Sequence, residues 1–354
     1  MNTSKTFATT FTLRAPDDWH CHLRDNDALT RTVPDIASRF QRAAIMPNLH
    51  SPVTHLDAAI AYRARIMSAA VSETPFEPMM TLYLTDDTTP DAIQTAAKHT
   101  DIILGFKLYP AHATTHSAAG VHHLHALYPT FEAMEKWDVP LLVHGESTDT
   151  TVDVFDREAV FIEQQLAPLQ RTFPALRIVL EHVSSKIGVD WVQAGGRVGA
   201  TITPHHLLLT RNDLLVGGLH PHHYCLPVVK TASDRQALIQ AAISGNPRFF
   251  LGTDSAPHTR LRKCADCGAA GIYSAPFALE YYAMVFEAQA ALDRLEAFAS
   301  QHGADFYGRP YNTHVVRLTR TDQTIPESLP FMDDVVIPLL AGQPLPWQMT
   351  WETA

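Results

Sequence analysis

The chain has 354 residues, 46% of them hydrophobic, and a formal net charge of −10 from 27 Lys and Arg against 37 Asp and Glu. A chain of this length can bury a large core without disulfides or structural metals. The acidic balance argues against a nucleic-acid or anionic membrane surface, and no apolar run approaches the ~18 residues of a membrane span. Because the N-terminal residues also lack the apolar stretch of a signal peptide, we expect a cytoplasmic protein.

Four cysteines, Cys21, Cys225, Cys264 and Cys267, are too few and too scattered for a disulfide framework. Cys264 and Cys267 form a CxxC pair, but a structural zinc site needs a second ligand pair at a compatible spacing, and none follows nearby. We therefore expect reduced thiols. The unusual feature of the composition is histidine, with 20 copies, several of them beside strand-like runs.

Short apolar runs rich in β-branched residues alternate with longer segments of helical spacing, which is typical of βα units around a parallel sheet. The runs cover residues 11–23, 42–48, 79–85, 102–110, 140–146, 177–183, 199–206 and 248–254. The amphipathic segments cover residues 28–40, 55–71, 89–99, 122–137, 156–170, 185–194, 232–244 and 276–290. This α/β alternation predicts a closed (β/α)8 TIM barrel in preference to an open doubly wound sheet.

No GxGxxG or P-loop motif opens any of these helices, so no motif supports a nucleotide-binding function. The sequence shows no linker, low-complexity tract or internal repeat, and we therefore expect one barrel domain over residues 1–354. From about residue 291 we expect a C-terminal extension with a helix, a strand-like run at 314–320 and a Pro-rich end that packs on the outside of the barrel.

Polar side chains of the kinds found in active sites stand where the apolar runs end. Enzymes with this barrel have their active sites at the C-terminal ends of the strands. The residues at these positions are His20, His22, Asn48, Lys107, His144, His182 and Asp254.

His20 and His22 flank one residue, so in an extended strand both imidazoles point to the same side and can reach one ion. Zinc suits such a pair, although two surface histidines in a loop would have the same spacing. His144 and His182 end two further runs, where a single histidine is more often a hydrogen-bonded structural residue than a metal ligand. Four histidines at one face of the barrel weaken that alternative.

Asp254 ends the eighth run and supplies a carboxylate that can bind a metal or transfer protons. Lys107 lies within an apolar strand, where a buried ammonium among metal ions is costly unless it is neutralised or modified. An unmodified ammonium cannot be a metal ligand. The alternative is a lysine whose charged end reaches solvent outside the barrel.

Several of these segments together resemble one known family. They are DDWHCHLRD (17–25), MPNL (46–49), GFKLYPAHATT (105–115), LLVHGE (141–146), LEHVSS (180–185), HYCLPVVK (223–230) and FLGTDSAPH (250–258). In this order and at comparable spacing from about residue 11 to 280, they resemble the bacterial-type, single-function dihydroorotases of the amidohydrolase superfamily.

The resemblance implies a binuclear zinc centre in which a bridging hydroxide is the nucleophile, because bound zinc lowers the pKa of water towards ~7. His20 and His22 would bind the more buried ion together with Asp254. His144 and His182 would bind the second ion.

The resemblance also implies that Lys107 carries CO2 as an N6-carboxylysine, whose two carbamate oxygens bridge the zinc ions. This modification removes the cost of a buried ammonium. The implied reaction is the reversible cyclisation of N-carbamoyl-L-aspartate to L-dihydroorotate and water in pyrimidine biosynthesis. Asp254 would be the general acid and base that moves a proton between the hydroxide and the ring nitrogen. The family further implies a homodimer.

Arg24 follows His22 by two residues, and its planar guanidinium can hold the substrate carboxylate through two parallel hydrogen bonds. The alternative is a surface ion pair with Asp25 or Asp27. The other substrate contacts that the resemblance implies are Asn48, His144, His258 and the main chain at Leu226 and Ala270.

The segment 111–120 is small, polar and close to glycines, which is typical of a mobile loop. By the resemblance, Thr114 and Thr115 in this loop close over the substrate, whereas the alternative is an ordinary connection between a strand and a helix. His50, His112 and His116 lie near the expected pocket without an assigned role, and we expect them at the surface.

Three alternative functions stay open at this point. A hydantoinase or allantoinase would share the metal centre, but its neutral substrate would not need Arg24 and Asn48 as a carboxylate site. A mononuclear deaminase is suggested by the HGE string at 144–146, but a one-metal site does not need Lys107 as a bridge. An inactive scaffold barrel would have lost a ligand, and every expected ligand is present.

Overall fold

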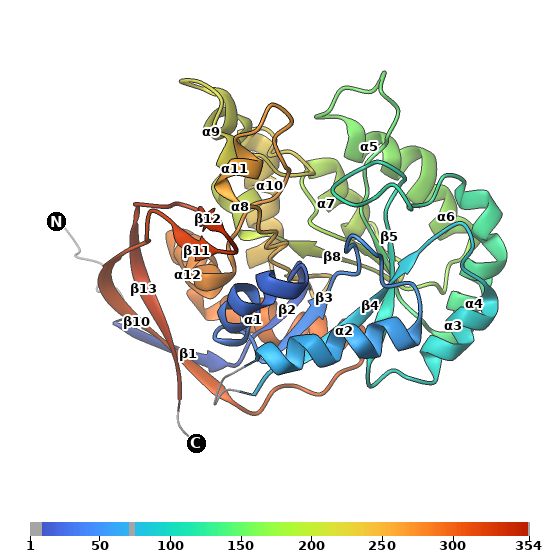
Figure 1. The fold of residues 1–354 in the computed structure, drawn as a ribbon, viewed down its shortest axis with the longest axis horizontal. Coiled ribbons are helices and arrows are strands. Elements are labelled where there is room, and N and C mark those ends of the chain that lie inside the picture. Colours follow the sequence, from blue (N-terminus) through green and yellow to red (C-terminus); the bar gives the residue numbers. More distant parts are fainter. Residues whose placement is uncertain (1–8, 71–74, 353–354) are drawn as a thin grey trace.

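The computed structural model describes residues 9–70 and 75–352. Eight parallel strands form one sheet in chain order, and helices surround it (Figure 1). The strands are β2 (Asp17–Cys21), β3 (Arg42–Ile45), β4 (Glu77–Leu84), β5 (Ile103–Leu108), β6 (Leu141–Val143), β7 (Ile178–Leu180), β8 (Val198–Ile202) and β9 (Phe249–Leu251). Main-chain hydrogen bonds from Asp254 to His20 (2.8 Å) and from His22 to Ser255 (3.0 Å) join the ends of β9 and β2. The predicted barrel is therefore confirmed.

The predicted helical segments are also helical in the structure. They form α1 (Leu29–Ala37), α2 (Leu56–Ala69), α3 (Pro90–Ala97), α4 (Tyr128–Trp137), α5 (Arg157–Phe161), α6 (Ala167–Thr172), α7 (Lys186–Gln193), α10 (Ala232–Ile243) and α12 (Ala278–Ala288). A π-helical turn over Ile162–Leu166 joins α5 to α6. Within the described residues, no helix has the length and apolarity that crossing a membrane requires.

Three short helices are additional to the prediction, because four or five residues are too few to show a helical period. They are α8 (Pro204–Leu208), α9 (Arg211–Leu215) and α11 (Arg260–Lys263), whereas α13 (His302–Tyr307) is the helix that the sequence predicts in the C-terminal extension. The first three lie in the loops that follow β8 and β9, at the end of the barrel where active sites form.

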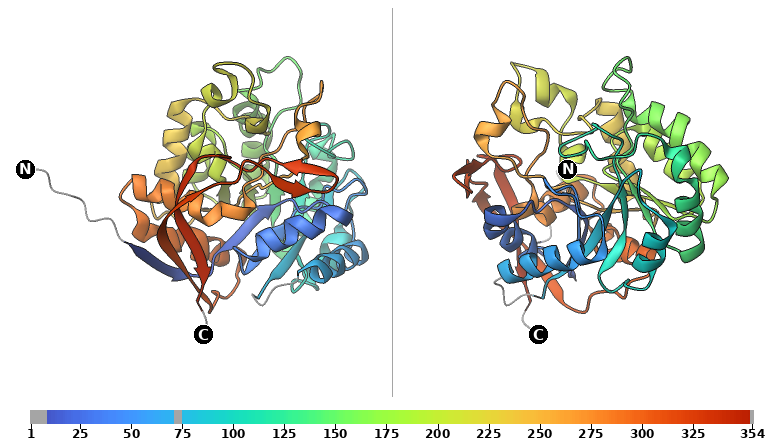
Figure 2. Two further views of the ribbon diagram at one scale, coloured as in Figure 1. Left: turned by 60° about the vertical axis from the view of Figure 1, so that its left-hand side comes forward. Right: turned by 45° about the vertical axis from the view of Figure 1, so that its right-hand side comes forward.

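The predicted first strand, residues 11–23, is not one strand. Its first part is β1 (Thr10–Arg14), which pairs antiparallel with β10 (Val315–Thr324), and β10 pairs with β13 (Pro344–Trp351). Only the second part, β2, belongs to the barrel. Pro16, which has no N–H to donate, lies between the two parts. Figure 2 shows β1 beside the strands of the C-terminal extension, so the two ends of the chain build one small sheet.

The C-terminal extension contains more strand than the sequence predicts. The Pro-rich end includes β13, in which Leu345, Trp347 and Met349 alternate with more exposed residues and are buried. A second pair of short strands, β11 (Leu329–Phe331) and β12 (Asp334–Val336), forms its own sheet. The extension therefore contacts the barrel through a sheet that also contains β1.

The interior of the barrel is apolar below the site. Trp19, Met79, Leu142 and Phe250 are among the residues that fill it, and Tyr307 of α13 stacks on Trp19 with ring centroids 4.7 Å apart. The packing is close, and a Cβ added at Gly303 would lie 2.0 Å from the Trp19 indole nitrogen. The apolar interior and α13 fill the barrel at this level, and the polar residues gather beyond them, at the strands' C-terminal ends.

A buried ion pair joins β2 to β3. The Arg42 guanidinium donates to both Asp17 carboxylate oxygens at 2.9 and 2.7 Å, and Asn312 donates to Asp17 at 2.7 Å. Asn312 also donates to the Ala15 carbonyl at 2.8 Å. This network links two barrel strands to the segment that precedes β10.

We predict that Arg42→Met lowers the free energy of unfolding by about 3–5 kcal/mol, because it leaves the buried Asp17 carboxylate without its cation. Arg65→Met is the matched control, since Arg65 pairs with Asp25 at 2.8 Å on the exposed surface. The control substitution should lower the free energy of unfolding by less than ~1 kcal/mol. Urea denaturation of the variants measures both values, and equal losses would contradict the assigned role of the buried pair.

Candidate active site

A pocket opens at the C-terminal ends of the barrel strands and contains most of the residues predicted from sequence. Its lining residues are His22, Arg24, Asn48, Tyr109, Thr114, Thr115, His144, His182, Leu226, Asp254, Ala256, Ala270 and Gly271. The other predicted site residues, His20, Lys107 and His258, contact or lie close to this lining. Segments far apart in the sequence thus converge on one pocket.

His20, His22 and Asp254 form a compact group that could hold one cation. Their ligand atoms lie within 4.8 Å of one another, and Asp254 Oδ1 is 3.4 Å from His20 Nε2 and 3.1 Å from His22 Nε2. Burial alone would raise the pKa of Asp254, but the neighbouring His20 and His22 rings hold it well below its ordinary value. The group therefore offers an ionised carboxylate beside two imidazoles.

Glu181 orients His20 and was missed by the sequence analysis. Glu181 is fully buried at the end of β7, and its Oε2 accepts from His20 Nδ1 at 2.8 Å and from Thr201 Oγ1 at 2.6 Å. A carboxylate on one ring nitrogen leaves the other free to bind a metal. The signal was available, because Glu181 follows Val179 by two residues and Val179 fills the barrel interior.

His144 and His182 form a second pair next to the first group. His144 Nδ1 lies 3.2 Å from His182 Nε2, and the His182 ring is 5.0 Å from the His20 ring. His144 Nε2 bonds to the buried Glu146 at 2.7 Å, another contact that the sequence analysis missed. Burial, then the charge of Lys107, lowers the pKa of His182 well below its ordinary value. This imidazole is therefore neutral and has a lone pair for a metal.

Lys107 is fully buried, so the alternative in which its charged end reaches solvent is wrong. In the described part of the chain, Lys107 Nζ has no hydrogen-bond partner. It lies 5.1 Å from the centre of the Tyr109 ring. Burial lowers the pKa of Lys107 to about 8, against the opposing effect of Glu181 and Asp254. A side chain in this state is unusual for a purely structural lysine.

Tyr109 is a pocket-lining residue that the sequence analysis missed. Its hydroxyl is buried, lines the pocket and has no hydrogen-bond partner among the residues described. Tyr109 follows Lys107 by two residues, which is the spacing that places side chains on one side of a strand.

The Arg24 guanidinium is free to bind an anion. No carboxylate in the described ranges lies within ion-pair distance of it, and Asp25 pairs with Arg65 instead. Arg24 Nη2 donates to His258 Nε2 at 3.0 Å, and Arg24 Nε donates to the Pro257 carbonyl at 3.2 Å. The alternative, a surface ion pair with Asp25 or Asp27, is therefore absent among the described residues, and Arg24 lines the pocket with His258 beside it.

Asn48 connects the pocket to the loop at 111–120. Its side-chain amide donates to the Thr115 carbonyl at 3.0 Å, and the Thr114 main-chain N–H donates to Ser117 at 2.8 Å. His116, expected at the surface, is exposed but also bonds to the Asn48 carbonyl at 3.3 Å. The structure thus places Thr114 and Thr115 at the pocket, while their motion stays a prediction.

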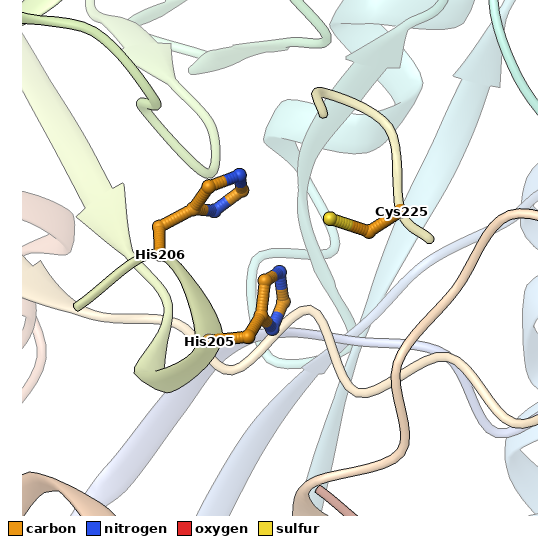
Figure 3. Close-up of side chains that lie close together, drawn as sticks. All are labelled: His205, His206 and Cys225. Atoms are coloured by element: carbon orange, nitrogen blue, oxygen red, sulfur yellow. The ribbon is translucent and has the colours of Figure 1, made fainter. Parts of the chain in front are cut away.

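A second cluster of possible metal ligands consists of His205, His206 and Cys225, all buried and pointing toward one another (Figure 3). Two of the three already have partners, because the Pro227 carbonyl accepts from His206 Nε2 at 3.0 Å and from the Cys225 thiol at 3.2 Å. His206 Nδ1 also bonds to Thr203 at 2.8 Å. We therefore interpret the cluster as a support for the segment around Pro227.

The CxxC pair does not form a disulfide. Cys264 and Cys267 are free and exposed, and the Cys264 thiol lies 3.8 Å from His222 Nε2. This agrees with the expectation of reduced thiols and gives the pair no part in the pocket.

Comparison with known proteins identifies the family. No protein-family model matches the sequence. The chain is 57% identical over 339 residues to a dihydroorotase of Coxiella burnetii, covering 96% of this chain and 97% of that protein. It is 55% identical over 342 residues to a dihydroorotase of Nitrosococcus oceani, covering 96% and 99%.

Solved structures agree with these relatives. The dihydroorotase of Saccharomyces cerevisiae in complex with 5-fluoroorotic acid superimposes with a TM-score of 0.90 at 36% identity, over 98% of this chain and all of that chain. An L-hydantoinase of Arthrobacter aurescens, at 18% identity and a TM-score of 0.76 over 98% and 86%, shares the fold alone. On the identity and coverage of these relatives, together with a fold that they share, the chain belongs to the dihydroorotase family.

Proposed function

We propose that this chain catalyses the reversible cyclisation of N-carbamoyl-L-aspartate to L-dihydroorotate. The observation that supports it best is one site in which four imidazoles, Asp254 and the buried Lys107 lie at or beside the pocket that Arg24 lines. Among the described residues, Lys107 Nζ has no hydrogen-bond partner and Arg24 has no ion-pair partner. The imidazoles, Asp254 and Lys107 suit metal-assisted hydrolysis of an amide, and Arg24 suits a substrate that carries a carboxylate. Relatives more than 50% identical over nearly their whole length are named for this activity.

The side chains fit two metal ions. His20, His22 and Asp254 would hold one ion, and His144 and His182 would hold the other. Lys107 Nζ is buried and has no hydrogen-bond partner in the described structure. In a two-ion site, this side chain would still need a bonding partner. Two zinc ions bound here would lower the pKa of water and polarise the ring carbonyl.

Lys107 is suited to carry CO2. Only a neutral amine adds CO2, and a pKa of about 8 leaves a neutral fraction at physiological pH. The resulting carbamate is anionic, so it replaces an ammonium that repels metal ions with two oxygen ligands. We therefore include carboxylated Lys107 in the proposal as the group that would bridge the two ions.

Asp254 is the proposed general acid and base. Its carboxylate is ionised, so it can take the proton of the attacking water as the oxygen adds to the ring carbonyl carbon. When the ring C–N bond breaks, the same carboxyl group would return that proton to the nitrogen. In the cyclisation, Asp254 would remove a proton from the carbamoyl nitrogen instead.

The other pocket residues would bind the substrate. Arg24, with His258 and Asn48 beside it, would hold the carboxylate, and the main chain at Leu226 and Ala270 would contact the ring. His258 is neutral, because burial and the Arg24 charge lower its pKa to about 2, so it accepts a hydrogen bond from Arg24. By the family resemblance we also infer loop closure through Thr114 and Thr115, a homodimer and a cytoplasmic location.

We predict that Asp254→Ala lowers kcat for dihydroorotate hydrolysis by at least ~100-fold, the usual contribution of a general acid or base. Because His20 and His22 remain, part of the bound metal should stay. Asp190→Ala, which removes an exposed carboxylate of α7, is the control and should leave both quantities unchanged. Steady-state kinetics and metal analysis of the same samples measure them. Turnover close to wild type in Asp254→Ala would exclude it from proton transfer.

We predict that Arg24→Met raises KM for dihydroorotate by roughly 10- to 100-fold, since hydrogen bonds to charged groups contribute ~1.5–3 kcal/mol. Hydrolysis of dihydrouracil, which has the ring without the carboxylate, should change little. This pair of substrates also separates the proposal from a hydantoinase, whose wild-type enzyme would prefer the neutral ring. The carboxylate site would be wrong if KM and kcat for dihydroorotate stayed at wild-type values.

A further inference from the structure

Lys263, the last residue of α11, is a buried lysine that the proposed mechanism does not use. Lys263 is 4% exposed, and no carboxylate within the described residues is among the charged groups that act on it. Nζ donates to the Tyr224 carbonyl and to the Gly271 carbonyl, each at 2.7 Å. Burial lowers the pKa of Lys263 to about 8. Nζ also lies 5.7 Å from the centre of the Tyr224 ring. A buried ammonium held by carbonyls and an aromatic ring is costly, so this arrangement calls for a function.

The two carbonyls belong to two separate loops of the pocket. Tyr224 lies two residues before Leu226, and Gly271 directly follows Ala270. Leu226, Ala270 and Gly271 all line the pocket. The Gly271 N–H also donates to the Tyr224 carbonyl at 3.0 Å, so Lys263 completes a junction between the loops.

The loop at Gly271 is packed closely against the carboxylate site. A Cβ added at Gly271, whose φ is +149°, would lie 2.6 Å from the Ala256 carbonyl oxygen and 2.9 Å from His258 Cδ2. His258, which lies against Gly271, bonds to Arg24. A shift of this loop would therefore move both the main chain that faces the ring and the partner of Arg24.

We propose that Lys263 is a positioning residue that ties the Leu226 loop to the Ala270 loop and so fixes the main-chain wall of the substrate pocket. Because no carboxylate in the described part of the chain cancels its charge, Lys263 also makes the pocket more favourable for an anionic ligand. This inference rests on the proposed function, since it assigns the tied loops to substrate binding.

Lys263→Met tests the proposal. Without the ammonium, the two loops separate and the main-chain contacts at Leu226 and Ala270 weaken in the substrate complex and the transition state alike. We expect KM for dihydroorotate to rise about 10-fold while kcat stays within about 3-fold, the pattern for lost uniform binding. A merely structural role would lower stability without this division between KM and kcat.

Lys230→Met is the matched control. Lys230 is also a buried lysine, 5% exposed, but its Nζ donates to Ser184 Oγ at 2.6 Å and it does not line the pocket. The control should lose stability and keep the wild-type KM. If both variants raised KM equally, the effect would come from general destabilisation and the proposal would be overturned.

Amide hydrogen exchange provides a readout that does not depend on turnover. In Lys263→Met the amides at 225–226 and 270–271 should exchange faster than in wild type, and in Lys230→Met they should not. If wild-type protein failed to hydrolyse dihydroorotate, the proposed function would fail, and the exchange comparison would still decide whether Lys263 ties the loops. Unchanged exchange together with unchanged KM in Lys263→Met would overturn the inference.

Discussion

The structure depends on one electrostatic constraint, a lysine ammonium buried beside imidazoles without a hydrogen-bond partner among the described residues. Lys107 Nζ has no hydrogen-bond partner in the described chain, and burial lowers its pKa to about 8. Leaving a buried polar group unsatisfied costs on the order of 1–3 kcal/mol or more for a charge. We propose that this cost is offset because Lys107 is converted to an anionic carbamate that bridges two cations.

The barrel places the proposed ligands around Lys107, and a further layer of side chains orients them. Closure of the sheet brings the end of β9 against β2, so that Asp254 meets His20 although 234 residues separate them. Glu181 then holds His20, and Glu146 holds His144. The other ring nitrogen of each of these histidines faces another proposed site residue.

Local sequence signals were sufficient for the barrel strands and for the residues at their ends. Apolar runs and the spacing of two between His20 and His22 report directly on a strand and its two faces. The split of residues 11–23 could not be predicted this way, because β1 pairs with β10, about 300 residues away in the chain. The strand β13 was missed for a different reason, because its proline residues obscured the alternation of buried and exposed side chains.

The supporting residues were harder to predict than the ligands. Glu181 directly precedes His182 and Glu146 follows His144 by two residues, where an acidic residue is equally typical of a solvated loop. Only Glu181 has a local signal, its spacing of two from Val179. Lys263 lies in an exposed-looking RLRK segment, and its burial depends on Tyr224 and Gly271, which reach it from different loops. The contacts of Lys263 are set by tertiary packing, and no local sequence pattern predicts them.

The central claim is a two-ion centre bridged by Lys107. Diffraction from crystals of zinc-replete protein, with data collected on both sides of the zinc absorption edge, tests it most directly. Our account predicts two anomalous peaks, one at His20, His22 and Asp254 and one at His144 and His182, with density for a carboxylated Lys107 joining them. A single peak, or two peaks with an unmodified Lys107 side chain directed away from both, would contradict it.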